Sequence, residues 1–482
     1  MGNNQKLKWE SVIGLEIHVQ LATESKIFSN APTEFGQTQN TQASLVDLGL
    51  PGVLPVLNEK TIEMAIKFGC AINADISSRA IFARKNYFYP DLPKGYQISQ
   101  LDDPIVGKGK IEIEVDEEKK SIGITRAHLE EDAGKSMHDR YENFSAIDLN
   151  RAGTPLLEIV SEPDLRSAKE SVAYLRKIHS LITFLEISDG NMSQGSMRCD
   201  ANVSIRKFGE KEYGNRTEIK NINSFKFVEK AINYEIQRQI EIIENGGKID
   251  QETRLYDAAK NETRSMRSKE HANDYRYFPE PDLIPLNISK EQIEEIRSAL
   301  PELPEEKRMR FVNDYGVSEY ESKNLNSSRE LSIFFEKIAQ KISSPKNAAK
   351  WILGDLTALL NKNNTFIEES KISSDKMIEL LKKLEDGALS GPGAKKILEL
   401  LWETEKSVNE LIASEGLDQV QDEGDIEKLI ATVIKENPKQ LEQFQNGKDK
   451  LFGFFVGQVM KASKGNANPK IVNEVLKKKL SQ

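Results

Sequence analysis

Polar residues able to bind a cation or move a proton alternate with apolar residues in the segment VIGLEIHVQL, residues 12–21. One set of alternate positions holds Gly14, Glu16, His18 and Gln20, and the positions between them hold branched apolar residues. Because successive side chains of a strand point to opposite faces, we expect a strand with one apolar and one polar face. An ordinary half-buried strand whose polar face meets water shows the same pattern. The chemistry therefore depends on whether other polar strands converge on this one.

Three further segments have a polar face of the same kind: ITRAHLEEDAGK (residues 124–135), NRAGTPLLEIVSEPD (150–164) and SMRCDANVSIR (196–206). Glu158 is the most telling residue, because it stands alone in the apolar run LLEIV. A carboxylate in an apolar strand must be paired, protonated or bound to a cation. Carboxylates with one imidazole suit a hard cation such as Mg²⁺, and His18 also allows Zn²⁺. Salt bridges to Arg126, Arg151, Arg198 and Arg206 explain the acidic residues equally well, so both interpretations stay open.

The loop FARKNYFYPDLPKGYQISQ, residues 82–100, mixes cations with aromatic rings. Such a mixture can stack a base and hold phosphates. A proline-rich loop that packs its own aromatic rings is the alternative. The sequence has neither a Walker A motif nor GxGxxG, so a nucleotide would bind here by another route.

Helical periodicity predicts helices at residues 58–73, 167–187 and 223–245, separated by short alternating strands. After Pro285 the strand alternation gives way to amphipathic helices. The fold class predicted is therefore α+β: a mixed or antiparallel sheet domain over residues 1–298, then all-α regions over 299–405 and 406–482.

Composition restricts the partners. The chain of 482 residues has 30% charged residues and a net charge of −9, so any nucleic-acid contact must come from local patches. One such patch begins at Lys448, and from there to the last residue the sequence has eight lysines but one Asp and one Glu.

No apolar run is long enough to span a bilayer, and the N-terminus lacks a secretory signal. Two cysteines form no disulfide framework or zinc spacing, which fits the cytoplasm. Cys199 on an apolar strand face suits a core residue better than a nucleophile.

Taken together, the motifs resemble the B subunits of glutamyl/aspartyl-tRNA amidotransferases, the GatB family. The segments that carry the resemblance run from Val12 to the C-terminus: GLEIHVQL, GLPGVLPVLN, RKNYFYPDLPKGYQISQ, HLEEDAGK, NRAGTPLLEIVSEPD, GSMRCDANVSIR, EIKNINSF, DYRYFPEPDLIPL and LFGFFVGQVMKASKGNANPKIVNEVLKKKL.

The resemblance implies a cradle domain with a kinase/transamidase pocket, a helical domain and a YqeY-like tail that grips tRNA. It implies a carbon–nitrogen ligase that uses ATP and Mg²⁺ to phosphorylate the side-chain carboxylate of Glu on tRNA(Gln) or Asp on tRNA(Asn). Ammonia from glutamine then displaces phosphate. The implied partners are an amidase-type A subunit, a small C subunit and the tRNA. A non-catalytic scaffold that only binds tRNA is the alternative, and a glutaminase that uses Cys199 is a weaker one.

The resemblance also implies roles for single residues. His18, Glu131 and Glu158 match the family's catalytic metal ligands, with Glu16 close by, and Glu131 could accept a proton from arriving ammonia. The expected contacts to ATP or the tRNA 3′ end are Lys85, Tyr87, Tyr89 and Arg198, and those to the tRNA body are Lys461, Lys464 and Lys470. One departure from the family is Pro392-Gly393, where a Lys and an aliphatic residue are usual; it affects the expected start of a helix and any tRNA contact made there.

Overall fold

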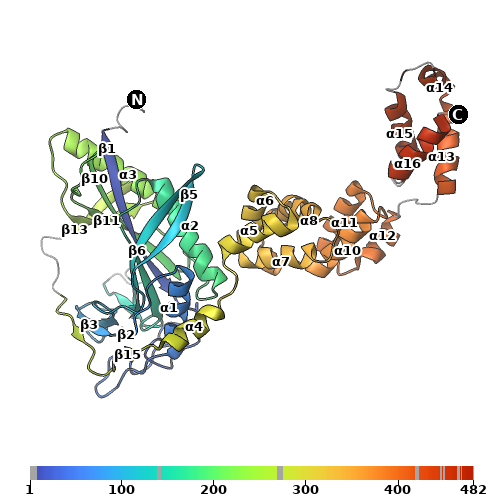
Figure 1. Cartoon of the computed structure of the whole chain (residues 1–482). Coiled ribbons are helices and arrows are strands. Elements are labelled where there is room, and N and C mark those ends of the chain that lie inside the picture. Colours follow the sequence, from blue (N-terminus) through green and yellow to red (C-terminus); the bar gives the residue numbers. More distant parts are fainter. Residues whose placement is uncertain are drawn as a thin grey trace. The chain divides into compact units, whose positions relative to one another are not determined.

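The computed structural model describes residues 8–137, 143–268, 275–417, 423–445, 448, 451–463, 467 and 469–480. The chain divides into two compact units, of which the first ends at Pro304 and the second begins at Glu305 (Figure 1). None of the described helices combines the length and the apolar character needed to cross a membrane.

The first unit is organised around a mixed sheet of eight strands. Their order across the sheet is β13 (Glu262–Ser268), β12 (Glu252–Asp257), β11 (Thr217–Lys220), β10 (Met197–Lys207), β1 (Trp9–Gln20), β9 (Pro155–Ser161), β6 (Glu118–Glu131) and β5 (Gly109–Val115). Among these described strands, only β11 and β12 pair in parallel. The expected mixed sheet is thus confirmed, and β1 lies near its centre (Figure 1).

The alternation predicted for residues 12–21 is confirmed in β1. Ile13, Leu15, Ile17 and Val19 are buried in the main hydrophobic core, while the residues between them stay partly accessible. The core also takes in apolar residues of three helices: α1 (Glu59–Ala71), α2 (Ala168–Phe184) and α3 (Phe225–Glu244). One face of the sheet is therefore the core, and the opposite face carries the polar side chains.

The three predicted helices begin where their caps require. Asn58, Ser167 and Ser224 each accept a hydrogen bond from the first turn of the following helix. After α3 the chain turns at Gly246, whose φ of +78° is a left-handed conformation that favours glycine. A fourth helix, α4 (Lys290–Ser298), packs on α1.

Small sheets border the main one. The strands β3 (Ala83–Asn86), β4 (Tyr96–Ser99) and β14 (Phe278–Pro279) form one, and β2 (Arg79–Ala80) pairs with β15 (Leu286–Asn287). A third pairs β7 (Lys135–Met137) with β8 (Ala146–Asp148). The first of these matters for function, because it brings the residues just before β14 beside the loop of residues 82–100.

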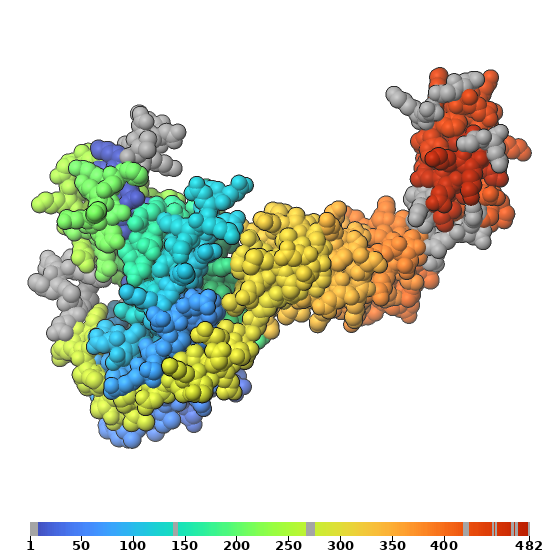
Figure 2. All heavy atoms as spheres, viewed as in Figure 1, coloured from blue at the N-terminus to red at the C-terminus, as the bar shows by residue number. Residues whose placement is uncertain are grey.

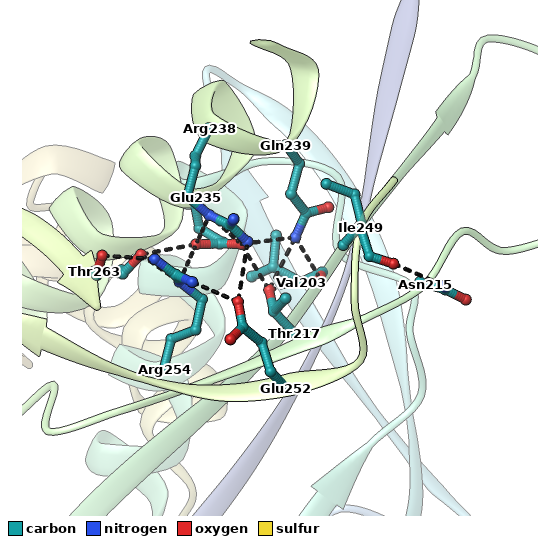
Figure 3. Close-up of polar contacts among 10 residues, drawn as sticks. All are labelled: Val203, Asn215, Thr217, Glu235, Arg238, Gln239, Ile249, Glu252, Arg254 and Thr263. Carbon is teal, nitrogen blue, oxygen red and sulfur yellow. Dashed lines mark hydrogen bonds and ion pairs between the residues drawn. The ribbon is translucent and has the colours of Figure 1, made fainter. Parts of the chain in front are cut away.

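A buried polar network fastens the outer strands to α3 (Figure 3). Glu235 has a side chain that is 0% exposed and accepts hydrogen bonds from Arg238, Gln239, Thr217 and Thr263. Thr217 opens β11, so this carboxylate holds β11 against the helix.

The second unit is helical in the residues that the structure describes, as predicted. Its helices are α5 (Pro304–Tyr315), which starts at the boundary, α6 (Glu319–Leu325), α7 (Arg329–Ala339), α8 (Pro345–Trp351), α9 (Thr357–Lys362), α10 (Ser374–Glu385), α11 (Gly391–Glu403), α12 (Val408–Glu415), α13 (Glu423–Glu436), α14 (Pro438–Gln445), α15 (Leu451–Ala462) and α16 (Pro469–Leu480). A short π-helix, Ile352–Leu356, joins α8 to α9, and a short 3₁₀ helix, Ile367–Glu369, follows α9.

Two separate hydrophobic cores stabilise these helices. One core runs from Phe311 to Ile412, and its helices form a continuous body, yellow to orange in Figure 2. The other includes residues of α13, α15 and α16.

The departure from the family at Pro392-Gly393 does not prevent a helix from starting there. Ser390 accepts a hydrogen bond from the Gly393 amide at 3.2 Å. The proline lies in the first turn of α11, where its missing N–H costs nothing.

Candidate active site

A row of polar residues crosses four strands on the polar face of the sheet. In the strand register, His18 on β1 lies opposite Arg198 on β10 and opposite Glu158 on β9. Glu158 in turn lies opposite His128 on β6. Residues directly opposite one another share a face, so the register alone aligns Arg198, His18, Glu158 and His128 side by side.

Two carboxylates and two imidazoles meet in this row. His18 Nε2 is 3.6 Å from Glu158 Oε2 and 3.7 Å from Glu130 Oε1. His128 Nε2 is 3.2 Å from the same Glu158 oxygen and 4.0 Å from Glu130 Oε2. We call His18, His128, Glu130 and Glu158 the acid–imidazole group.

The group has donors that fit a divalent cation. One ligand atom each from His18, Glu130 and Glu158 lies within 4.8 Å of the others. Two carboxylates and one imidazole from three different strands are a donor set that hard and borderline cations accept.

The electrostatics separate the two carboxyl groups. Burial alone would raise the pKa of Glu158, but the charges of His128 and His18 and the hydrogen bond with His128 lower it. Burial and the charge of Glu158 raise the pKa of Glu130. Two adjacent carboxyl groups whose pKa values are pushed apart can keep one ionised while the other holds a proton.

Glu131, named as a ligand with Glu158, lies apart from this group in the structure. Its Oε1 accepts hydrogen bonds from the Lys94 ammonium and from the Ile98 amide, the latter at 2.8 Å. The strand explains the difference, because Glu130 shares the parity of His128 on β6 and Glu131 has the opposite parity. The structure therefore does not bring Glu131 together with His18 and Glu158, and its role as a metal ligand stays a prediction.

Glu16 lies in a second acidic group, with Asp200 and Glu218. Asn202 donates a hydrogen bond to Glu16 at 2.9 Å. Lys220 already supplies a cation there, at 2.5 Å from Asp200 and 3.0 Å from Glu218. Burial and the charges of Glu158 and Glu218 raise the pKa of Glu16.

Lys85 lies at the border of the acid–imidazole group. Although burial opposes it, the charges of Glu130 and Glu158 are among the causes that raise the pKa of Lys85. Its ammonium is 5.7 Å from the ring centre of Tyr87 and 5.1 Å from that of Tyr275, within the range of a cation–π contact. The predicted mixture of cation and aromatic ring is thus present at Lys85 and Tyr87.

Among the residues that the structure describes, the others predicted to contact ATP or tRNA do not share the cation–π contacts of Lys85. Tyr89 is 56% exposed and joins Leu92 in a short bridge. Arg198 donates to Asp132 at 2.8 Å. Lys461 is exposed at the end of α15, Lys464 lies outside the described residues, and Lys470 lies on α16 at a position whose side chain the structure does not describe.

Three of the four arginines considered as salt-bridge partners pair with carboxylates outside the acid–imidazole group, and one of these carboxylates, Asp132, belongs to the polar segment 124–135, as the salt-bridge interpretation predicted. Arg151 and Arg198 pair with Asp132, Arg206 pairs with Glu10, and Arg126 donates to His128 Nδ1 at 3.4 Å. Cys199, predicted as a core residue, is buried in the main core.

Sequence reasoning passed over Glu130, His128 and Tyr275 as site residues. Parity along β6 could have selected the first two, since both share the face that meets Glu158. Tyr275 lies in the motif DYRYFPEPDLIPL, but nothing in that motif places it near Lys85. It comes close through the pairing of β14 with β3 and through the hydrogen bond from the Asn86 amide to its carbonyl at 2.9 Å.

The chain is similar to known proteins along nearly its whole length. Residues 11–294 match the model of the GatB/GatE catalytic domain, and residues 333–480 match that of the GatB domain. The chain is 60% identical to the B subunit of the aspartyl/glutamyl-tRNA(Asn/Gln) amidotransferase of Thioalkalivibrio sulfidiphilus, over 98% of this chain and 100% of that protein. The proteins of the same name from Hahella chejuensis and Pseudomonas aeruginosa PAO1 are 58% and 57% identical, each over 98% of this chain and 100% of their own length. The chain therefore belongs to the family of aspartyl/glutamyl-tRNA(Asn/Gln) amidotransferase B subunits.

Proposed function

We propose that this chain carries the activation and transfer steps that convert Glu-tRNA(Gln), Asp-tRNA(Asn) or both into the amidated forms. The observation that carries the proposal is the acid–imidazole group, with Lys85 beside it, on the polar face of the sheet. A scaffold that only binds tRNA has no need of two adjacent carboxyl groups with opposed pKa shifts.

The proposed reaction has two steps. A carboxylate oxygen of the misacylated residue attacks the γ-phosphorus of ATP, a new O–P bond forms, and ADP leaves. Ammonia then attacks the activated carbonyl carbon, the C–N bond forms, and inorganic phosphate leaves with the electrons of the C–O bond. The nitrogen loses a proton, which a nearby carboxylate accepts.

The residues have separate tasks in this proposal. His18, Glu130 and Glu158 would hold Mg²⁺, which when bound offsets the repulsion between carboxylate and phosphate oxygens. Lys85, Tyr87, Tyr89 and Arg198 would contact ATP or the tRNA 3′ end. Glu131, next to Lys94, would accept the proton from the incoming nitrogen, and Glu16 would support the metal site from the neighbouring acidic group.

The proposal extends to partners and location. An amidase-type A subunit would release ammonia from glutamine, and a small C subunit would complete the heterotrimer. The cradle domain, residues 1–298, would perform the chemistry, and the helical domain, residues 299–405, would connect it to the tail. The tail, residues 406–482, would bind tRNA through Lys461, Lys464 and Lys470. The two cysteines are free thiols, which suits the reducing cytoplasm where translation occurs.

One assay tests the proposal directly. The chain, co-expressed with its A and C partners, receives Glu-tRNA(Gln) or Asp-tRNA(Asn), ATP, Mg²⁺ and ammonium chloride without glutamine. We expect amidated tRNA that disappears when ATP is omitted. Because ammonium bypasses the glutaminase, failure with both tRNAs would contradict the proposal and favour a scaffold.

A further inference from the structure

Two arginines converge on one buried carboxylate at the end of the polar row. Asp132 follows β6 directly and is 4% exposed. Its Oδ2 accepts hydrogen bonds from Arg198 at 2.8 Å and from Gln20 at 3.0 Å, and Arg151 Nε lies 3.6 Å from the same oxygen. One carboxylate therefore faces two guanidinium groups, which leaves one positive charge in excess.

The orientation of both arginines is fixed independently of any ligand. Arg151 donates to the carbonyls of Ala133 and Gly134 at 2.9 and 2.7 Å. Arg198 lies on β10, where the register places it opposite His18. Groups held in this way lose little freedom when a ligand binds.

Some donor capacity is left over. Arg198 Nε is buried without a hydrogen-bond partner, although the side chain as a whole is 34% exposed. A buried polar atom without a partner calls for an explanation, and a group that arrives with the substrate supplies one. The Arg151 side chain is 37% exposed, so it is also open to a ligand.

Other charges near Arg198 do not cancel the excess. Glu130 and Asp200 both act on its guanidinium electrostatically. Asp200, however, pairs with Lys220 at 2.5 Å, and Glu130 lies 3.7 Å from His18. Asp132 is thus the carboxylate that the two arginines share.

We infer that Arg198 and Arg151, positioned by Asp132 and Gln20, form an anion subsite for a phosphate group next to the acid–imidazole group. The planar guanidinium matches the oxygens of phosphate, stays charged at every working pH and can bind two oxygens at once. The inference deepens the proposed function and rests on it for the source of the phosphate. That source is either ATP or the backbone of the tRNA 3′ end.

Binding measurements on the complex with its A and C partners distinguish these sources. The variants are Arg198→Gln, Arg151→Gln and Arg198→Lys, and the probes are a non-hydrolysable ATP analogue with Mg²⁺ and Glu-tRNA(Gln). The matched control is Arg206→Gln, which lies on the same strand and parity but pairs with Glu10 at 2.6 Å. Thermal unfolding of each variant tells a folding defect from a binding defect.

We expect each Gln variant to weaken binding of one probe by at least about tenfold, because a charge-assisted hydrogen bond is lost, with Arg198→Lys in between. Weaker binding of the ATP analogue assigns the phosphate to ATP, and weaker binding of the tRNA assigns it to the 3′ end. If folded Arg198→Gln bound both probes as tightly as the Arg206→Gln control, the inference would be wrong. Because binding is measured without turnover, this result is separate from failure of the ammonium assay.

Discussion

Glu158 is ionised because of its neighbours. Its strand places it between His18 on one side and His128 on the other, so two imidazoles offset the cost of burying the charge. Glu130 faces the same two imidazoles but is more deeply buried and carries the raised pKa. The two carboxyl groups of the pair therefore have opposed pKa shifts although they face the same imidazoles.

Glu158→Gln should reduce amide formation by at least about 100-fold even with free ammonium, because the substitution removes the ionised member of the pair. The measurement is the rate of amidated tRNA formation in the ammonium assay. Glu162→Gln is the matched control, since Glu162 follows the same strand but bonds to Thr125 at 3.0 Å. Equal rates for the two variants would contradict the assigned site.

Glu130 and Glu131 can be told apart by their dependence on Mg²⁺. The geometry places Glu130 within the donor set, whereas Glu131 is bonded to Lys94 and Ile98. We expect Glu130→Gln to raise the Mg²⁺ concentration for half-maximal rate by about 10–100-fold. Glu131→Gln should lower the rate with the Mg²⁺ requirement unchanged. The reverse pattern would restore Glu131 as the ligand.

At the scale of elements, the polar face depends on hydrogen bonds that hold its strands to α3 on the opposite side of the sheet. Thr217 points toward Glu235 in α3, so the next residue on β11, Glu218, points to the opposite face with Asp200 (Figure 3). The network around Glu235 thereby fixes which residues of β11 reach the polar face.

Glu235→Gln should lower the free energy of unfolding by roughly 3–5 kcal/mol, since Arg238 and Arg254 would lose a buried partner. Denaturant unfolding of the complex or the chain measures it. Glu241→Gln, an exposed position on the same helix, should change stability by less than about 0.5 kcal/mol. A loss no larger than that of this control would show that the network is dispensable.

The same carboxylate predicts a pH dependence. Although burial opposes it, hydrogen bonds from Arg238 and Gln239 lower the pKa of Glu235 below its ordinary value of 4.5. A group with a lowered pKa stabilises the fold above its unfolded value and loses that contribution as pH falls through the folded value. The difference in unfolding free energy between wild type and Glu235→Gln should therefore be constant above about pH 5 and shrink in more acidic buffer. A difference that grew on acidification would give the opposite sign and refute this account.

At the scale of the whole molecule, charge is distributed unevenly. The chain has a net charge of −9, yet lysines gather in the last 35 residues. A local basic patch on an acidic protein attracts a polyanion that the rest of the surface repels, so the proposed tRNA contacts fall in this region.

Lys461→Gln should weaken tRNA binding severalfold. It should also reduce the magnitude of the slope of log affinity against log salt concentration by about 1, the value expected for the loss of one phosphate contact. Affinity measured between low and moderate salt checks it. Lys382→Gln is the control, because this lysine is exposed on α10, outside the tail. A slope unchanged from wild type would remove Lys461 from the tRNA contacts.

Much of this protein could be determined from the sequence, where neighbours in the chain decide the structure. The alternation in β1 and the three capped helices depend on local periodicity and caps, and they are present in the structure. The predicted change to helices is also present, but it begins with α4 at Lys290, because the short strand β15 still follows Pro285. The motifs in their order also sufficed to identify the family.

Only the tertiary structure decided which polar residues meet. Strand order and register place His18 between Arg198 and Glu158, and they select Glu130 rather than Glu131 for the group. Tyr275 reaches Lys85 from almost two hundred residues away. Periodicity gives the face of each strand but not its neighbour, because pairing is set by packing and hydrogen bonds between segments that are distant in the chain.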